Sequence, residues 1–577
     1  MQNADIAKIF LEIAELLEVS NENSFKIRAF QRAAQTVGSY KEPLEDIYSK
    51  GGIKALEQIE GIGLSTAEII EDLIKTGKSR RHQELLHKFP KGFIKLLEIP
   101  SIGPKTALLL HKKFKIESTD DLEKALKKGL LKNVPGFKEK RQENIRQGLE
   151  LKKKIKGRFL LSEASDTADT LVKSLKSSTD IGVEDILIAG SLRRGKETIG
   201  DIDILVVSKH PKAVMDAFVK LPLSGRTLSH GETKSSIVLK NGIQADIRVV
   251  PRESFGAAAH YFTGSKSHNI HIRQLAQKKG WKVNEYGIFD SKGKQIGGEK
   301  ELDMFSKFGY EYIPPELREM QGEFEAAEKN KIPILVELGD IKGDLQMHST
   351  YSDGSNSIEE MAQSAKELGY SYVAITDHSK STRIASGLSE QEFLRQLSHI
   401  DKINSKLVGF RILKGIEVDI LKDGSLDYSD DVLRHCDVVV AAIHSNFKMN
   451  INSMTERILK ALANKYVNIL SHPTGRLIGK RNPYEVDMEE VFKAARDSGT
   501  FLEINAQPDR LDLNDSLARR AKEFGISISI DTDAHSASQL NNMRYGVLTA
   551  RRGWLEKKDV INALPIEKLL IKLNSKR

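Results

Sequence analysis

Eight potential metal ligands are distributed along the C-terminal half of the chain, each at the end of a short apolar run. They are His348, Asp353, His378, Glu417, His444, His472, Asp533 and His535. The apolar runs have the length of buried strands and alternate with helical stretches. In a barrel built this way, the ends of the strands meet at one rim, where the chemistry occurs. We therefore expect a metal-dependent hydrolase in this half.

Length and composition indicate a multidomain globular protein. The chain has 577 residues, too many for one core, and 39% of them are hydrophobic. No apolar run is long enough for a membrane span, and the first ten residues lack the features of a signal peptide. The single cysteine, Cys436, excludes an intrachain disulfide framework. We expect a cytoplasmic protein with no membrane association.

The positive charge of the chain is concentrated near its N-terminus. Residues 1–160 hold 31 Lys and Arg against 22 Asp and Glu, which accounts for the whole net charge of +9. A polyanion is the obvious partner for such a region. A basic solvated face without a ligand explains the charge equally well, so motifs must decide between the two.

Residues 1–150 have apolar side chains at helical spacing and a repeated glycine hairpin. The hairpins are residues 59–63 (IEGIG), 99–103 (IPSIG) and, in a weaker form, 134–137 (VPGF). A helix that follows such a hairpin presents backbone N–H groups and its positive dipole end to a phosphate. This repeat favours binding of the DNA backbone over simple tight turns. The candidate contacts are Gly61, Gly63, Gly103, Lys105 and Gly136.

Two later regions have strand patterns. Apolar runs at 186–189, 202–207, 237–239 and 243–250 predict one sheet, and Pro314 and Pro315 begin a charged connection. From residue 341, runs at 372–376, 411–415, 438–443, 468–471, 501–504 and 526–531 alternate with helical stretches. This alternation predicts parallel β/α units, with closure into a barrel as one possibility.

A second cluster of carboxylates lies in the middle region. Asp201 and Asp203 are two residues apart at the start of a strand, so they share one face, and Asp246 interrupts another apolar strand. Three converging carboxylates need divalent cations such as Mg²⁺ between them, and two such ions serve phosphoryl transfer. Ser191 follows Gly190 in a turn that can hold a phosphate, and Arg194 can clamp one. Exposed strand-end carboxylates are the minor alternative.

The Gly190-Ser191 pair followed by Asp201-x-Asp203 resembles the signature of the nucleotidyltransferase superfamily. Residues 261–265 (YFTGS), with Asn269 and Arg273, resemble the thumb of the family X DNA polymerases. This resemblance covers roughly residues 1–320. It implies that the three aspartates bind Mg²⁺ or Mn²⁺ and that Ser191 and Arg194 hold a deoxynucleoside triphosphate. The further implied contacts are Tyr261, Phe262 and Gly264 at the sugar, Asn269 at the base, Arg273 at the template and Lys26 at a DNA 5′-phosphate.

Residues 335–577 resemble the PHP domain, a distorted β/α barrel with a trinuclear metal site. The resemblance implies Mn²⁺ or Zn²⁺, with iron as a further candidate, and a 3′→5′ exonuclease with 3′-end or abasic-site processing. A family X polymerase joined to a PHP domain is the layout of bacterial and archaeal family X DNA polymerases. The expected domains are 1–85 (lyase-like), 86–155 (helix-hairpin-helix), 156–252 (palm), 253–318 (thumb), 319–340 (linker) and 341–577 (PHP).

Two positions depart from these family patterns. The lysine that acts as lyase nucleophile is replaced by Ile69, which cannot form a Schiff base, and a neighbouring lysine is replaced by Ser65. The first histidine of the PHP pattern is replaced by Gln346, whose amide is a weaker ligand. We expect no usual lyase activity and a PHP site that still binds metal with one ion weakened or lost.

These observations predict a monomeric repair polymerase that fills gaps or nicks in DNA and processes 3′ ends. Two alternatives remain open on the sequence. One is a phosphoesterase or nuclease whose N-terminal half only grips DNA, and the other is a non-catalytic scaffold at DNA ends. Arg476 and Arg510 follow ligand-bearing segments and are candidates for gripping a DNA phosphate, with ordinary surface arginines almost as good an explanation.

Overall fold

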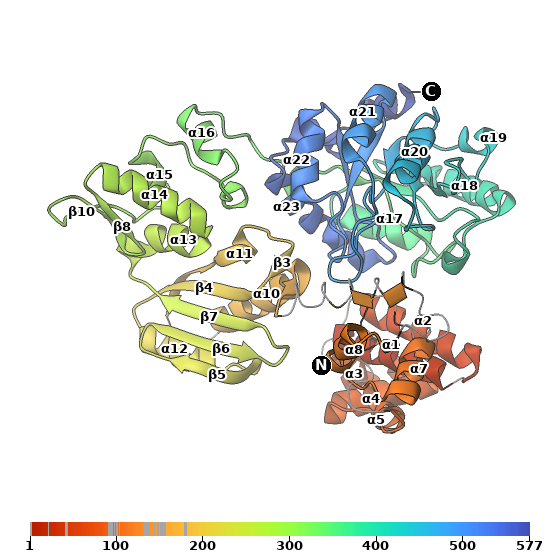
Figure 1. Ribbon diagram of the computed structural model, residues 1–577, viewed down its shortest axis with the longest axis horizontal. Helices are drawn as coiled ribbons and strands as arrows, with labels where there is room; N and C mark the ends of the chain where they lie inside the picture. The colour runs from red at the N-terminus through yellow and green to blue at the C-terminus, as the bar shows by residue number, and fades with distance from the viewer. Residues whose placement is uncertain are drawn as a thin grey trace.

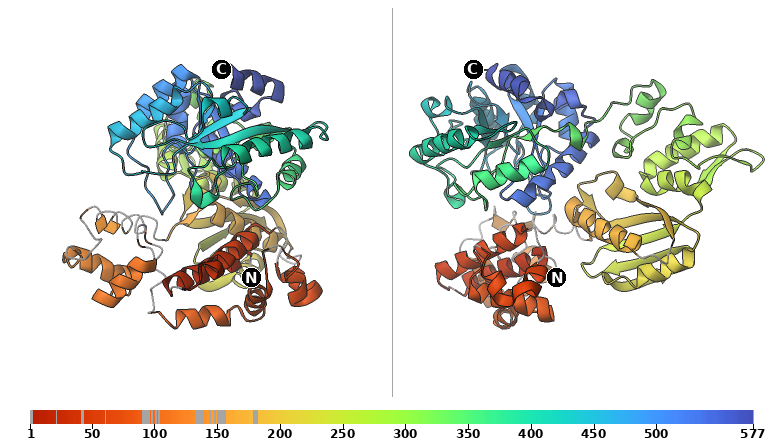
Figure 2. Two further views of the ribbon diagram at one scale, coloured as in Figure 1. Left: turned by 90° about the vertical axis from the view of Figure 1, so that its right-hand side faces the viewer. Right: turned by 180° about the vertical axis from the view of Figure 1, so that it is seen from behind.

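The computed structural model of the protein describes residues 3–20, 22–40, 44–59, 61–89, 96, 99, 102, 104–131, 139, 141–142, 145–146, 149, 157–177 and 182–576. Figure 1 shows four parts in chain order: an N-terminal helical part, a middle sheet, a smaller mixed part and a C-terminal β/α domain. In both views of Figure 2 the C-terminal domain lies above the N-terminal helices. None of the described helices combines the length and apolarity needed to cross a lipid bilayer.

The N-terminal part is helical, as its apolar spacing predicts. Its helices are α1 (Asn3–Val19), α2 (Ser24–Ser39), α3 (Leu44–Leu56), α4 (Leu64–Thr76), α5 (Arg80–Leu86), α7 (Pro104–Phe114) and α8 (Thr119–Lys127). Ile6, Phe10 and Ile13, which recur every three or four residues along α1, are fully buried. Because Gly61 has a φ of +87°, the chain can turn between α3 and α4 there without the strain that a side chain would bring.

The middle part is a five-stranded mixed sheet with the strand order β2-β4-β7-β6-β5. The strands are β2 (Val183–Ile188), β4 (Asp201–Ser208), β5 (Ser224–His230), β6 (Lys234–Leu239) and β7 (Gln244–Val249). Only β4 and β7 run parallel to each other. Helices α10 (Leu161–Ser177) and α12 (Pro211–Val219) cover one face of the sheet and share its apolar core. The pair β1 (Phe159–Leu160) and β3 (Thr198–Ile199) and the short helix α11 (Gly190–Arg193) lie beside it.

The next part joins helices to a small sheet. It contains α13 (Phe255–Thr263), α14 (Lys266–Lys278), β8 (Lys282–Asn284), β9 (Gly287–Phe289), β10 (Gln295–Gly297), α15 (Asp303–Ser306) and α16 (Glu323–Glu328). Ser265 caps α14 by accepting a hydrogen bond from the backbone N–H of His268. Ala257, Ile272 and Phe305 belong to a separate apolar core, so this part has its own packing.

The C-terminal part is a seven-stranded parallel sheet in chain order, almost closed into a barrel. Its strands are β11 (Gly343–Asp344), β12 (Tyr372–Ile375), β13 (Arg411–Asp419), β14 (Val438–Ala442), β15 (Ile469–Leu470), β16 (Phe501–Asn505) and β17 (Ile528–Asp531). A parallel bridge between Met347 and Ala534 brings the segments after the first and last strands together. The strands are buried on both faces, which explains their uninterrupted apolar sequences.

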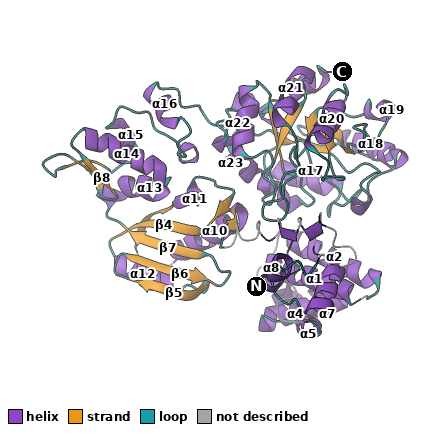
Figure 3. Cartoon of the chain, in the orientation of Figure 1, coloured by secondary structure: helices purple, strands orange, loops and turns teal. Residues whose placement is uncertain are grey.

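Helices surround this barrel (Figure 3). They are α17 (Ile358–Glu367), α18 (Glu390–Asn404), α19 (Asp430–Leu433), α20 (Ile451–Leu462), α21 (Met488–Ser498), α22 (Asp515–Glu523), α23 (Met543–Arg552) and α24 (Ile566–Asn574). The fold class predicted from the sequence is confirmed: helical N-terminal part, mixed sheet and distorted β/α barrel. Tyr545 and Leu511 of the barrel join the buried core of the middle sheet, so the two halves pack directly against each other.

Candidate active sites

The three aspartates of the middle sheet converge at one end of the parallel pair β4 and β7. In the register of this pair Asp203 is opposite Asp246, and Asp201 is opposite Gln244. One carboxylate oxygen from each aspartate lies within 4.8 Å of the other two. The Gln244 amide donates to both oxygens of Asp246, at 3.1 and 3.3 Å. The sequence therefore predicted correctly that these side chains lie together.

The electrostatics of this cluster favour a cation. Burial, together with the carboxylates of Asp201 and Asp246, raises the pKa of Asp203 to about 7. Burial and Asp246 also raise the pKa of Asp201. Such shifts mean that the third negative charge is costly without a counter-ion, and divalent cations would supply one. The donor set, three carboxylates and no imidazole, fits Mg²⁺ or Mn²⁺.

Gly190 allows the adjacent turn to approach the cluster closely. Its φ is +64°, and a Cβ atom there would lie 2.2 Å from Oδ2 of Asp203. Any side chain would therefore displace the carboxylate. Ser191 follows in α11, next to this contact. The position of this turn is consistent with a phosphate held beside the carboxylates.

Among the predicted nucleotide contacts, Arg194 and Gly264 lie beside each other. Its Nε atom donates to Oε1 of Glu319 at 3.0 Å, and its Nη1 atom donates to the carbonyl oxygen of Thr263. Gly264 lies close by, because a Cβ atom there would lie 3.2 Å from Nη1 of Arg194. The Asn269 amide donates to the carbonyl of Tyr261 at 2.7 Å.

The remaining predicted contacts are Phe262, on the same segment as Tyr261, and Arg273, on α14. The ring of Phe262 packs against that of Tyr261 and under the guanidinium of Arg248. Nε of Arg273 donates to the carbonyl of Asn269, one turn earlier on α14, at 3.3 Å. The structure thus places Thr263 and Gly264, at the end of this segment, next to Arg194.

The predicted DNA contacts in the N-terminal part are only partly described. Lys26 is exposed on α2 and pairs with Glu22 at 3.3 Å. Gly61 and Gly63 lie in the turn before α4, and Gly63 is the N-cap residue of that helix. Gly103 and Gly136 lie outside the described residues, as does the side chain of Lys105 in α7. Ile69, at the expected lyase position, is buried in the apolar core of the helices.

In the barrel, the buried carboxylate of Glu417 on β13 is surrounded by imidazoles. Its oxygens lie 3.0 Å from Nδ1 of His378, 3.3 Å from Nε2 of His444 and 3.2 Å from Nε2 of His472. The contact between Glu417 and His378 is short but lacks hydrogen-bond geometry. Neither Nδ1 of His378 nor Oε2 of Glu417 has a hydrogen-bond partner among the residues that the structure describes. Ligand atoms that converge on a shared ion have this arrangement.

The other four predicted ligands complete the same cluster. Nε2 of His348 lies 3.0 Å from Oδ1 of Asp533, and Nε2 of His535 lies 3.4 Å from Oδ2 of Asp353. The rings of His348 and His535 are stacked with centroids 4.2 Å apart. All eight predicted ligands, contributed by segments from residue 348 to residue 535, therefore meet at one rim of the barrel.

The carboxylates and imidazoles of this cluster shift one another's pKa values. Burial would raise the pKa of Asp353, but the facing imidazoles outweigh it and lower that pKa to about 2. Burial would lower the pKa of His444, but Glu417 and Asp419 raise it to about 10. For His378 burial dominates, and its pKa falls to about 4. A metal would compete with these protons, and the mixed imidazole and carboxylate donors fit manganese, zinc or iron.

Gln346 occupies the position of the missing histidine, on the segment that leads to His348. Its side chain is fully buried, and neither its amide oxygen nor its amide nitrogen has a hydrogen-bond partner among the described residues. An unsatisfied buried amide is costly. Both polar atoms of the amide are therefore free to accept or donate a contact that the described protein groups do not supply.

Several supporting carboxylates were not predicted from the sequence. Asp377 accepts hydrogen bonds from the backbone N–H and the hydroxyl of Ser349, at 2.8 and 2.6 Å, and so fixes the segment of His348. Glu503 accepts from the backbone N–H of His472 at 2.7 Å. The only sequence signal for Asp377 was its position beside His378. Such partners orient the ligands of metal sites.

The two arginines that follow the ligand segments have different surroundings. Arg476 donates to the carbonyl of Arg510 and to Glu197 of the middle part, at 2.9 and 2.8 Å. Nε of Arg510 lies 3.7 Å from Oδ2 of Asp533. Arg476 therefore connects the two halves, whereas Arg510 lies beside the metal-ligand cluster.

Comparison with known protein families covers most of the chain. Residues 1–79 match a helix-hairpin-helix domain, and residues 93–152 match a SAM-like helix-hairpin-helix tandem. Residues 161–247 match the DNA polymerase beta palm, and residues 258–319 match the DNA polymerase beta thumb. Residues 344–507 match the PHP domain.

Individual relatives agree with these matches. A protein of Bacillus subtilis (strain 168) described as DNA polymerase/3′-5′ exonuclease PolX is 39% identical over 98% of both chains. Probable phosphatases of Thermoanaerobacter sp. (strain X514) and Acetivibrio thermocellus are 28% and 30% identical over 36% and 31% of this chain, and over 84% and 73% of their own lengths. The chain belongs to the family X DNA polymerases that carry a C-terminal PHP domain.

Proposed function

We propose that Asp201, Asp203 and Asp246 hold two divalent cations, Mg²⁺ or Mn²⁺, during nucleotidyl transfer. The observation that carries this proposal is the convergence of their oxygens within 4.8 Å, in a site that raises the pKa of Asp203 to about 7. Bound cations would supply the positive charge that stabilises the attacking and leaving oxygens of the transfer. The three carboxylates would hold the cations, and Gln244 orients Asp246 by donating to both of its oxygens.

The residues around Arg194 would bind the deoxynucleoside triphosphate. Glu319 orients Arg194, which would clamp phosphate oxygens with its remaining N–H groups. The turn at Gly190 and Ser191 would hold the same triphosphate against the carboxylates. Tyr261, Phe262 and Gly264 would line the sugar, Asn269 the base and Arg273 the template strand. The hydrogen bond from Asn269 to Tyr261 supports a common site for these residues.

The PHP site would degrade DNA from its 3′ end and clean 3′ ends or abasic sites. Its eight ligands would hold Mn²⁺ or Zn²⁺, with iron as a further candidate, and Gln346 would bind one ion weakly. The buried carboxylate of Glu417, which faces three imidazoles, supports an ion at the centre of the cluster. Arg510 would hold a DNA phosphate beside it.

The substrate would be gapped or nicked DNA. Two helix-hairpin-helix regions support backbone binding, with Lys26, Gly61, Gly63, Gly103, Lys105 and Gly136 as candidate contacts. Because all the residues proposed for both sites come from one chain, the protein would act as a monomer. Its single buried cysteine fits the cytoplasm.

A time course on a one-nucleotide gap, with and without nucleotides, tests this function. Full-length wild type, Asp203→Asn and Glu417→Gln would be compared with Mg²⁺ and with Mn²⁺. Asp203→Asn should abolish gap filling but keep 3′→5′ degradation, and Glu417→Gln should do the reverse. Gap filling by Asp203→Asn at the wild-type rate would refute the polymerase assignment, and degradation by Glu417→Gln at that rate would refute the PHP assignment.

A further inference from the structure

Helix α23 of the PHP domain lies between the two catalytic halves. It packs against β16 and β17 of the barrel on one side. On the other side its Tyr545 and Leu548 pack with the apolar core of the palm. The helix begins soon after the segment that carries His535, so one short stretch of chain leads from the PHP site to the palm.

The last residue of α23, Arg552, makes a buried set of polar contacts across this interface. Its side chain is 5% exposed. Its Nε and Nη2 atoms donate to Oδ2 of Asp515 at 2.9 and 2.6 Å. Its Nη1 atom donates to the backbone carbonyl of Arg194 at 2.8 Å and to Oε1 of Glu319 at 3.2 Å.

Glu319 is shared by arginines from both halves. The same oxygen that accepts from Arg552 also accepts from Nε of Arg194 at 3.0 Å, and Nζ of Lys196 lies 3.6 Å away. Burial would raise the pKa of Glu319, but Arg194, Arg552 and Lys196 together lower it. The carboxylate therefore remains charged. It accepts from one of the five N–H donors of Arg194 and so fixes the plane of that guanidinium.

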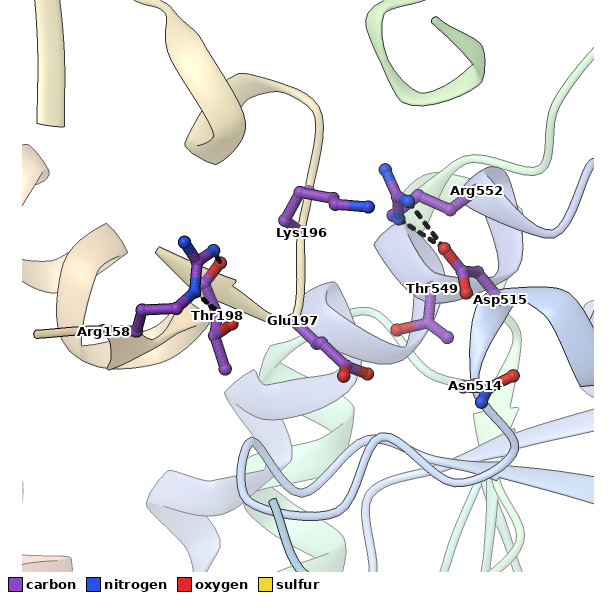
Figure 4. Close-up of a pocket in the computed structure, with 9 residues that line it drawn as sticks. Arg158, Lys196, Glu197, Thr198, Asn514, Asp515, Thr549 and Arg552 are labelled. Atoms are coloured by element: carbon purple, nitrogen blue, oxygen red, sulfur yellow. Dashed lines mark hydrogen bonds and ion pairs between the residues drawn. The ribbon is translucent and has the colours of Figure 1, made fainter. Parts of the chain in front are cut away.

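The backbone that follows Arg194 also packs against α23. Gly195 has a φ of +63°, and a Cβ atom there would lie 3.4 Å from Leu548 and 3.6 Å from Cδ of Arg552. Figure 4 shows Arg552 and Asp515 of the PHP domain facing Lys196 of the palm across a cavity of about 200 Å³. The turn from Arg194 to Lys196 is thus held from outside the polymerase half.

We propose that Arg552 of the PHP domain is a positioning residue for the polymerase reaction, which sets the affinity for the incoming nucleotide by fixing Arg194. This inference rests on the proposed role of Arg194 in binding the triphosphate. Arg552 holds Arg194 twice, directly at its backbone carbonyl and indirectly through Glu319. The PHP domain then contributes to nucleotide selection as well as to hydrolysis.

The physical reason is that these contacts are buried and charge-assisted. Without Arg552, the carbonyl of Arg194 loses its donor and Glu319 keeps only palm cations as partners. The turn can then shift, and the guanidinium no longer faces the triphosphate in a fixed orientation. Since preorganisation lowers the cost of binding, its loss weakens nucleotide binding more than it slows the chemical step.

Steady-state filling of a one-nucleotide gap by the full-length enzyme tests the proposal. The variants are Arg552→Ala, Arg552→Lys and, as a matched control, Arg544→Ala, which removes an arginine of the same helix that pairs with exposed Asp166 of the palm. We expect Arg552→Ala to raise the KM for the nucleotide about tenfold with kcat within about twofold, as expected for lost ground-state binding. The KM of Arg552→Lys should lie between those of wild type and Arg552→Ala, because lysine keeps the positive charge but not the planar set of N–H donors.

Two controls test whether the effect of Arg552→Ala is specific to nucleotide binding. Arg544→Ala should keep the wild-type KM, and the 3′→5′ degradation rate of Arg552→Ala should match wild type, which shows that the PHP domain is folded. If Arg552→Ala does not fold, Glu319→Gln tests the same link from the polymerase side and should raise the same KM.

Two results would overturn the proposal. The first is an unchanged nucleotide KM in Arg552→Ala, or in Glu319→Gln when that variant replaces it. The second is a fall in kcat at constant KM. An Arg194→Ala variant is measured in parallel: an unchanged KM there refutes the role of Arg194 itself. A raised KM in Arg194→Ala with an unchanged KM in Arg552→Ala refutes only the positioning role of Arg552.

Discussion

Asp203 on β4 lies directly opposite Asp246 on β7, in the parallel register of these two strands. Asp201, two residues before Asp203, projects from the same face of β4 and completes the cluster. Because the three side chains come from the ends of two hydrogen-bonded strands, their separation is fixed by the sheet itself. Rigid placement of this kind is what a site for two cations requires.

Gly190→Ala should impair the polymerase selectively. Its Cβ atom would lie 2.2 Å from Oδ2 of Asp203, and the φ of +64° is unfavourable for alanine. We expect gap filling to fall at least about tenfold, since displacing the carboxylate and straining the turn together cost more than ~1.4 kcal/mol. The 3′→5′ degradation rate should not change.

The matched control for this change is Gly293→Ala, where φ is +79° and no heavy atom lies within 4 Å of the Cβ position. It introduces the same backbone strain without the clash and should retain gap filling. Equal activity in Gly190→Ala and wild type would show that the turn does not need to approach Asp203.

Glu301→Gln should destabilise the protein in a pH-dependent way. Glu301 accepts hydrogen bonds from Arg193 and Arg318 at 2.7 Å each. Burial would raise its pKa, but Arg318 and Arg193 outweigh it and lower that pKa to about 2 from 4.5. A lowered carboxylate pKa stabilises the fold above the unfolded value of 4.5, and this contribution is lost as the pH falls towards 2.

Denaturant unfolding at pH 7 and pH 3 measures this effect. The free energy of unfolding should fall by about 3 kcal/mol at pH 7 and by only about 1.4 kcal/mol at pH 3, at ~1.4 kcal/mol per pKa unit. Glu299→Gln, which changes an exposed glutamate nearby, should have little effect at either pH. If Glu301→Gln lowered the free energy of unfolding equally at both pH values, the ion pairs of Glu301 with Arg193 and Arg318 would not lower its pKa as described.

Gln346→His should strengthen metal binding at the PHP site. The amide of Gln346 is buried, and neither of its polar atoms has a hydrogen-bond partner among the described residues. An imidazole at the same place would be a stronger metal ligand. We expect more Mn²⁺ per chain by elemental analysis, with the weakest ion bound about tenfold more tightly, and faster 3′→5′ degradation. Gln363→His, on an exposed face of α17, is the control. Unchanged metal content would mean that position 346 does not reach an ion.

The protein should lack the usual 5′-deoxyribose phosphate lyase activity. Ile69 is 4% exposed and packs in the core of the helical part, and only an amine can form the Schiff base. Borohydride reduction in the presence of a 5′-deoxyribose phosphate gap should therefore trap no covalent adduct. An adduct would show that another lysine, such as Lys26, supplies the amine.

Much of the fold could be predicted because its strands are apolar and buried. Strand β14, for example, is a run of five buried residues in sequence and in structure. Strand β5 was missed because six of its seven residues are exposed and its sequence has no apolar alternation. Its pairing with β6 depends on backbone hydrogen bonds, which leave no trace in side-chain pattern.

The side chains proposed for both sites could be grouped from the sequence because they lie in or next to strands, and the ends of neighbouring strands meet. The contacts that position them could not be predicted in the same way. Arg194 meets Glu319 across 125 residues and Arg552 across 358 residues of sequence. Arginine and glutamate are mostly exposed in proteins, so nothing in their local sequence distinguishes a buried pair from a solvated one.

The most direct test of the account is binding of a non-hydrolysable deoxynucleoside triphosphate to the full-length enzyme on gapped DNA, titrated with Mn²⁺. Wild type should bind the nucleotide tightly only when Mn²⁺ is present, and Asp203→Asn should lose this Mn²⁺-dependent gain. Mn²⁺-dependent nucleotide binding that is equally tight in Asp203→Asn would contradict the claim that these three carboxylates hold the catalytic cations.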